Sequence, residues 1–206
     1  MKIKLLSVGL FLVCAAVVQA KPTESNLIAY AQSGDFGKMK DALDRLPNMY
    51  PNSTNAIAII KGILRSNETI VVTERVMVSS QKPLYRKTPH VMVVRIAARS
   101  LGNYHTTLNE IELNIIYNKL LKSRDEEDAM DGLKALRGMN APEAIPLIIP
   151  LLEDGNTHVV RDSIRTLGVI GNKSTIRFIE PLMQNSRSDI KWDALAAIQL
   201  LKSKPN

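Results

Sequence analysis

The chain has 206 residues, of which 27 are Lys or Arg and 20 are Asp or Glu, and only 4% are aromatic. This length is sufficient for one substantial domain or two small ones. Its charged and apolar fractions, 23% and 45%, exclude wholesale disorder and a fibrous class. Because rings are scarce, the core must consist of aliphatic residues and methionine, which favours helices over a β-sandwich.

The first twenty residues have the three-part pattern of a secretory signal peptide. Lys2 and Lys4 give a positively charged start, residues 5–13 form an apolar run, and residues 18–20 (Val-Gln-Ala) resemble a cleavage site. The apolar run is short for a transmembrane helix, and no stop-transfer charges follow it. We therefore expect cleavage after Ala20 and no stable membrane insertion of the mature chain.

Removal of this leader also removes the only cysteine, Cys14, and lowers the formal charge from +7 to +5 because two lysines leave. Val13 precedes Cys14 where a bacterial lipidation signal requires a smaller residue, so we expect no lipidation. Exported eukaryotic proteins of this size usually carry disulfides. The sequence therefore favours a bacterial protein that is periplasmic or secreted.

A repeat of 31 residues organises the second half of the chain. Apolar residues coincide at this shift in three sets: Leu133, Ile164 and Leu195; Leu136, Leu167 and Ile198; and Met139, Ile170 and Leu201. Spacings of three and four residues within each unit predict amphipathic helices. Turns at residues 154–156 and 185–187 interrupt the units. Each repeat is therefore expected to be a pair of short helices that stacks on its neighbours.

Residues 151–172, LLEDGNTHVVRDSIRTLGVIGN, resemble a HEAT repeat, in particular the short HEAT-like repeats of the phycobilisome-lyase type. Asp154, Val159 and the closing Leu-Gly-Val-Ile-Gly fit the family pattern, whereas Val160 stands where an Arg is usual. The resemblance is best over residues 125–202. It implies a right-handed α-solenoid of stacked antiparallel helix pairs whose second helices line the concave surface. Such a fold does not by itself specify a function.

The first half shows the same organisation less regularly, with residues 94–102 echoing residues 160–168 at an offset of 66. A Thr-x-x-Glu pattern at residues 107–110 predicts a capping box and a helix that ends near Leu121. Further helices are expected over residues 25–32, 35–46, 54–65 and 69–79. The last of these is rich in β-branched residues that would also suit a strand, and we prefer the helix.

Two proline-containing segments, residues 47–53 and 80–89, are expected to be loops. The sequence thus predicts a single all-α domain over residues 21–206, with irregular repeats over 25–121 and regular ones over 125–202. We expect about ten or eleven helices and no sheet.

Catalytic motifs are not evident in the sequence, which contains no nucleophile elbow, phosphate loop or glycine-rich dinucleotide turn. The three histidines are dispersed, and His158 with Asp162 is the one weak metal-binding pair. An acidic run over residues 125–131 could mimic a cation site, but acids are also favourable at a helix N-terminus, which we prefer. We therefore predict a protein that is not an enzyme and has no cofactor and no metal site.

Basic residues recur at equivalent positions of the repeats. One column contains Arg99, Lys134 and Arg165; its neighbour contains Arg95 and Arg161 and ends in Trp192; and Lys191 occupies the slot of the usual family Arg. The two columns lie four residues apart on the second helices, and hence on one face. Like charges in register favour a negatively charged partner. Alternatively, the arginines bridge adjacent repeats through Asp131, Asp162 or Asp193 on a solvated face.

These features predict an exported, non-catalytic protein–protein interaction module or scaffold, for example in a bacterial envelope assembly or secretion complex. Its concave face would bind a protein partner with an acidic surface, and Trp192 would be either an anchor for that partner or a cap on the last helix. An enzyme or enzyme-accessory protein of the HEAT-like lyase type is the alternative. Modest charge and few aromatics argue against nucleic acid, and we expect no small-molecule substrate.

Overall fold

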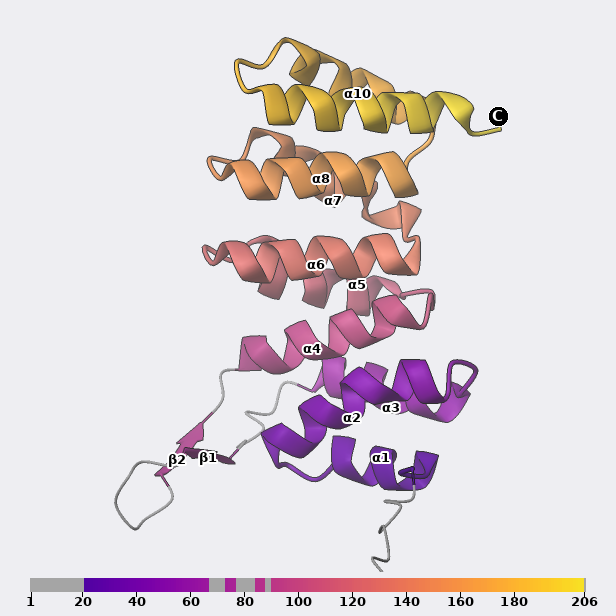
Figure 1. Cartoon of the computed structure of the whole chain (residues 1–206), viewed down its shortest axis with the longest axis vertical. Helices are drawn as coiled ribbons and strands as arrows, with labels where there is room; N and C mark the ends of the chain where they lie inside the picture. The colour runs from indigo at the N-terminus through magenta and orange to yellow at the C-terminus, as the bar shows by residue number, and fades with distance from the viewer. Residues whose placement is uncertain (1–20, 67–72, 77–83, 88–89, 206) are drawn as a thin grey trace, which may run out of the picture.

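The computed structural model describes residues 21–66, 73–76, 84–87 and 90–205, so the expected signal peptide lies outside the described residues. Helices stack on one another along the long axis of the molecule, from α1 at one end to α10 at the other (Figure 1). The described ranges contain ten α-helices: α1 (Glu24–Ala31), α2 (Phe36–Met49), α3 (Thr54–Arg65), α4 (His90–Asn103), α5 (Glu110–Ile116), α6 (Glu126–Met139), α7 (Ile145–Ile148), α8 (Thr157–Ile170), α9 (Ile176–Ile179) and α10 (Ser188–Ser203). The expected all-α solenoid of paired helices is thereby confirmed.

The two members of each regular pair differ in length. The second helices α6, α8 and α10 contain 14, 14 and 16 residues. The first helices α7 and α9 contain four residues each and continue as 3-10 turns, η3 (Ile149–Glu153) and η5 (Glu180–Gln184). Pro150 and Pro181 lie at the start of these turns, where a missing amide hydrogen and a bulky ring prevent a regular α-helix from continuing.

The expectation of no sheet is wrong. Strands β1 (Thr73–Val76) and β2 (Leu84–Lys87) pair antiparallel, with Thr73 opposite Lys87 and Val76 opposite Leu84. A strand therefore lies within the segment expected to be the helix 69–79, and another lies within the expected loop 80–89. The β-branched Thr73 and Val76 lose side-chain freedom in a helix, and this preference outweighed the helical spacing.

Two helix boundaries also differ from expectation. Pro47 lies inside α2, so the loop expected over residues 47–53 begins only at Tyr50. The capping box is formed by Asn109 and Glu112, two residues beyond the predicted one, and each side chain accepts the other's backbone amide at 2.9 Å. The helix continues through a π-helical turn, η1 (Tyr117–Leu121), and so ends where the sequence predicts.

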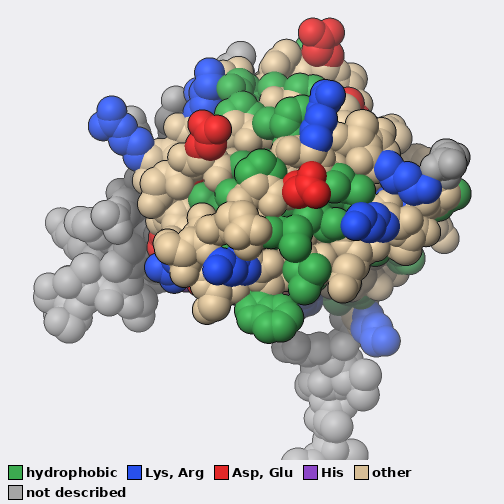
Figure 2. Space-filling model, turned by 90° about the horizontal axis from the view of Figure 1, so that it is seen from above, with side chains coloured by type: hydrophobic (Ala, Val, Ile, Leu, Met, Phe, Trp, Pro, Cys, Tyr) green, Lys and Arg blue, Asp and Glu red, His purple; other side chains and the backbone are tan. Residues whose placement is uncertain are grey.

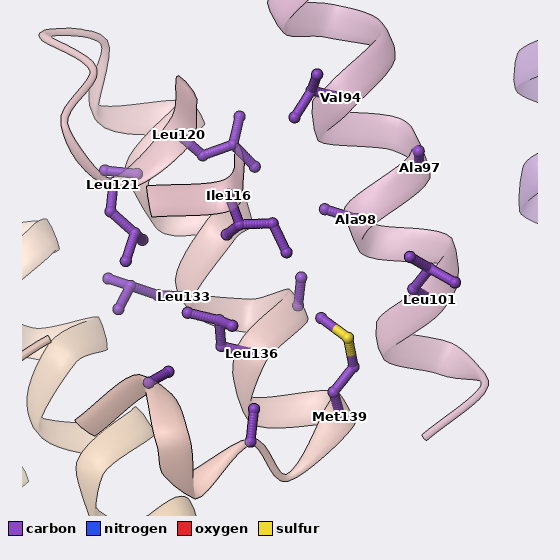
Figure 3. Close-up of a cluster of buried hydrophobic side chains, with 14 of the residues drawn as sticks. Val94, Ala97, Ala98, Leu101, Ile116, Leu120, Leu121, Leu133, Leu136 and Met139 are labelled. Atoms are coloured by element: carbon purple, nitrogen blue, oxygen red, sulfur yellow. The ribbon is translucent and has the colours of Figure 1, made fainter. Parts of the chain in front are cut away.

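Aliphatic side chains form a core that runs along the stack. Figure 3 shows Leu101 of α4 and the Leu136 and Met139 side chains of α6 gathered with Ile116. The repeat register predicts this burial: the first two members of each aligned set lie in the core, namely Leu133, Ile164, Leu136, Leu167, Met139 and Ile170. The 31-residue alignment therefore identifies the core positions.

Close helix packing explains why glycine stands at two positions of the second helices. A Cβ atom on Gly138 would lie 2.7 Å from the carbonyl oxygen of Gly102, and one on Gly168 would lie 3.0 Å from the Cβ of Ala197. Backbones of neighbouring second helices thus touch at these positions, and a larger side chain would push them apart. Among the described helices, none is long and apolar enough to cross a membrane.

Candidate protein-binding surfaces

The second helices α4, α6, α8 and α10 lie side by side along one face of the stack (Figure 1). We call this surface the second-helix face. It carries the predicted columns Arg95 and Arg161, and Arg99, Lys134 and Arg165. Lys191 and Trp192 are on α10, at the end of the stack.

Arg95 reaches from α4 to three carboxylates on α6. Its guanidinium lies 2.8 Å from Asp131, 3.2 Å from Glu127 and 3.3 Å from Asp128. Burial alone would lower the pKa of Arg95, but the hydrogen bond to Asp128 and the neighbouring negative charges outweigh it and raise that pKa. Three-quarters of the Arg95 side chain is covered. Arg95 therefore joins two repeats. This agrees with the bridging alternative from the sequence and not with a freely exposed side chain.

The same arrangement recurs two steps later, between α8 and α10. Asp193 accepts from Arg161 Nε at 2.6 Å through one oxygen and from Arg165 Nε at 3.0 Å through the other. Arg161 also lies 3.5 Å from Asp189. The hydrogen bond to Asp193 is the main cause that raises the pKa of Arg161. Two arginines of one repeat thus converge on a single carboxylate of the next.

The column of Arg99, Lys134 and Arg165 is more open to solvent than the column of Arg95 and Arg161. The side chains of Arg99, Lys134 and Arg165 are 39%, 47% and 45% exposed. Arg99 pairs with Asp44 of α2 at 2.8 Å, and Lys134 lies 3.7 Å from Asp131 of its own helix. Of these three residues, only Arg165 bridges adjacent repeats through a carboxylate that the sequence suggested, Asp193, whereas Lys134 contacts only its own helix. Partner binding by the same residues stays a prediction.

The ladder of ion pairs is interrupted between α6 and α8. Met130 occupies in α6 the position that Arg161 occupies in α8, 31 residues later. Asp162 is 5% exposed, and one of its carboxylate oxygens has no hydrogen-bond partner among the described residues. Its other oxygen lies 3.4 Å from Arg165 on the same helix. Within the described part of the chain, no ion pair joins α6 to α8.

A shallow groove of about 250 Å³ runs between α8 and α10 on the second-helix face. It is mostly apolar, and its lining is Arg137, Arg165, Gly168, Val169, Asp193, Ala196, Ala197 and Leu200. Val169 and Leu200 are exposed although both are large and apolar. Sequence reasoning missed these two residues, and the signal available was their separation of 31 residues at a solvent-facing position. Of the predicted site residues, only Arg165 lines this groove.

Trp192 is 69% exposed and lies at the C-terminal end of the stack, away from the groove. With Lys191 it lines a second hollow of about 260 Å³, whose other walls are Met183, Ser188 and Leu195. Figure 2 looks onto this end and shows apolar side chains across its centre, with an acidic side chain among them and Lys and Arg side chains around them. The predicted residues thus divide between two surfaces, the second-helix face and the end of the stack.

The acidic run at residues 125–131 is held by the fold of α6. Asp125 caps the helix through the amide of Glu127 at 2.9 Å, and Asp128 accepts from the Ser123 hydroxyl at 2.8 Å. His158 lies in the first turn of α8. Within the described ranges, no group of three His, Cys, Asp or Glu side chains is placed to hold a metal ion.

Residues 113–199 match the family described as HEAT repeats. Among solved structures, the fold is similar to that in the complex of CpcE and CpcF of phycocyanin lyase from Nostoc sp. PCC7120. The TM-score is 0.63 and the identity 22%, over 92% of this chain and 69% of that chain. A comparison with curated proteins finds no match.

Designed armadillo repeat proteins are also similar in fold. One, solved in complex with the peptide (KR)4, has a TM-score of 0.55 and 15% identity, over 86% of this chain and 81% of that chain. Another, designed for modular peptide recognition, has a TM-score of 0.53 and 15% identity, over 89% of this chain and 84% of that chain. Residues 113–199 are therefore HEAT repeats, and the described chain has the all-α solenoid fold of HEAT and armadillo repeat proteins.

Proposed function

We propose that the mature chain is an exported, non-catalytic protein-interaction module that binds a partner with an acidic surface on its second-helix face. The contact would centre on the groove between α8 and α10. The N-terminal sequence pattern supports export, and a bacterial envelope assembly or secretion complex is the setting that we favour. An enzyme-accessory role of the lyase type rests on likeness of fold alone.

One observation carries this proposal: beside the groove, two cations of the second-helix face are more exposed than the carboxylates that they contact. Lys134 and Arg165 are 47% and 45% exposed, whereas the side chains of Asp131, Asp162 and Asp193 are at most 15% exposed. A partner would therefore meet positive charge although the ion pairs are neutral as pairs. Arginine is also one of the residue types enriched among those that dominate protein-binding energetics.

The relatives in fold support the same class of function. One of the structures is a complex of two proteins, CpcE and CpcF, and one of the designed armadillo proteins holds a peptide. An extended solenoid offers a continuous surface without needing a catalytic centre.

Site-specific photo-crosslinking in the native cells tests the proposal. A photoreactive amino acid at Leu200, in the groove, is expected to give a discrete adduct with a partner protein. The matched control is the same substitution at Ile111, which is 63% exposed on the first helix α5. An adduct that also loses intensity in an Arg165→Gln background would support the groove. Adducts of equal intensity at both positions, or none at Leu200, would reject it.

A further inference from the structure

The last repeat leaves uncovered the surface on which a further repeat would stack. In the two internal repeats, Leu133 and Ile164 are fully buried, whereas the equivalent Leu195 of α10 is only half-buried. Ala129 and Val160 are buried, and the equivalent residue is the exposed Lys191. Leu152 likewise corresponds to the half-buried Met183. We call the surface formed by Met183, Ser188, Lys191, Trp192 and Leu195 the end face.

The end face contains an apolar hollow that apolar side chains of a partner could enter. Met183 and Leu195 contribute apolar surface to its hollow of about 260 Å³, and Trp192 forms a wall. An indole that is 69% exposed at the edge of an apolar hollow is a typical anchor of a protein interface. A helix that stacked here would continue the packing that already joins α8 to α10.

Charge at this end is predominantly positive. Lys191 and Lys202 make no ion pair within the described residues, and Arg177 is exposed beside the ring of Phe178. Asp189 and Asp193 of the last helix pair with arginines, whereas Glu180 of η5 is exposed and makes no ion pair within the described residues. Figure 2 shows an acidic side chain among the apolar ones at the centre, and more Lys and Arg than Asp and Glu around them.

We propose that the end face binds an amphipathic helix of another protein, with an apolar stripe that enters the hollow and Asp or Glu residues that flank the stripe. Charge complementarity argues for this occupant. A second copy of the chain, paired through the same surface, would place like charges opposite each other. This inference shares with the proposed function only the idea that the chain binds proteins. It concerns a different surface and can stand if the groove does not bind.

Tryptophan fluorescence tests the end face directly, because Trp192 is the only tryptophan of the chain. The probe is a synthetic 16-residue helical peptide, with Leu at spacings of three and four residues and Glu at the flanking positions. We expect the emission of the mature protein to shift to shorter wavelength in a saturable manner, and the affinity to fall several-fold at high salt. The matched probe carries Lys in place of every Glu and is expected to leave the emission unchanged.

Two variants separate the end face from the rest of the molecule. Lys191→Glu is expected to lower the affinity for the acidic probe on the order of tenfold. The melting temperature of this variant should stay at the wild-type value because Lys191 is exposed. Arg99→Gln, far away on α4, should bind the probe as the wild type does. An unchanged Trp192 emission with the acidic probe, an equal response to both probes, or equal losses in both variants would overturn the proposal. The crosslinking at Leu200 is independent of all three results.

Discussion

The hydroxyl of Ser100 in α4 donates a 2.7 Å hydrogen bond to the carbonyl oxygen of Leu43 in α2. In a regular helix that carbonyl would accept from the amide four residues later, but Pro47 stands there and has no amide hydrogen. Ser100 is 2% exposed, so the bond is made away from water. A side chain of one repeat therefore completes the backbone hydrogen bonding of another, which is how α2 extends through its proline.

Replacement of Ser100 by Ala should leave the Leu43 carbonyl buried and unpaired, and should destabilise the protein by about 1–3 kcal/mol. The matched control is Ser163→Ala in α8. Ser163 is fully buried, and its hydroxyl has no partner among the described residues, so its loss should be neutral or stabilising. Urea denaturation of both variants measures the difference. Equal effects of the two substitutions would contradict the assigned role of Ser100.

Restoring the missing step of the ion-pair ladder should stabilise the protein. Met130→Arg introduces a guanidinium at the position equivalent to Arg161 in the next repeat, and by that equivalence we expect it to reach the unpartnered oxygen of Asp162. We expect a gain of about 0.5–1.5 kcal/mol in the free energy of unfolding, the range of one partly exposed charged hydrogen bond. The gain should vanish when Met130→Arg is combined with Asp162→Asn. If the double variant keeps it, the added arginine acts elsewhere.

Acid sensitivity should arise in part from Glu112, whose side chain is fully buried beneath Lys61 and Arg65. Burial alone would raise the pKa of Glu112, but the amide of Asn109 and the two cations outweigh it and hold that pKa below its ordinary value. The carboxylate therefore contributes stability that is fully present above about pH 4.3 and is lost as the pH falls through the lowered pKa.

The variant Glu112→Gln isolates this contribution. At neutral pH it should be less stable than the wild type by about 1–3 kcal/mol, because charged hydrogen bonds are lost. Its stability should then fall less steeply than that of the wild type between pH 5 and pH 3. Urea midpoints measured across this range give both quantities. Parallel curves for the two proteins would show that Glu112 does not carry the acid dependence.

Core truncation tests the repeat register. Leu167 is fully buried in α8, and Leu167→Ala should cost about 2–5 kcal/mol through lost burial and a cavity. The control is Leu200→Ala, because Leu200 is exposed on α10. This substitution should lower the free energy of unfolding by less than about 0.5 kcal/mol. Thermal and urea melts compare the two variants. A silent Leu167→Ala would require a different alignment of the repeats.

The 31-residue spacing predicts the core because burial depends on which side of a helix a residue occupies, and sequence periodicity encodes that side directly. Leu133, Ile164, Leu136 and Leu167 are fully buried as the alignment requires. The hairpin of β1 and β2 was not predicted, because a run of β-branched residues is compatible with both the period of a helix and the period of a strand. The capping box moved to Asn109 because an amide side chain caps as well as a hydroxyl.

The candidate surfaces were less predictable. Spacing placed Arg161 and Arg165 on one face and offered Asp193 as a possible bridge, but it did not reveal that both arginines share this one carboxylate. Exposure of Val169 and Leu200 likewise follows from the packing of two helices and not from either helix alone. Trp192 could be read as an anchor or as a cap, and its 69% exposure shows that most of its side chain is uncovered by the described chain.

The contact between Gly168 and Ala197 bears on how the groove between α8 and α10 would bind. Both residues line the groove, and their helices meet there at backbone distance. The floor is therefore built from main chain and single methyl groups, which have no rotamers to lose. A partner that enters the groove would pay little ordering entropy on this side of the interface. The stack thus presents a preorganised surface, whose affinity would depend chiefly on the order already present in the partner.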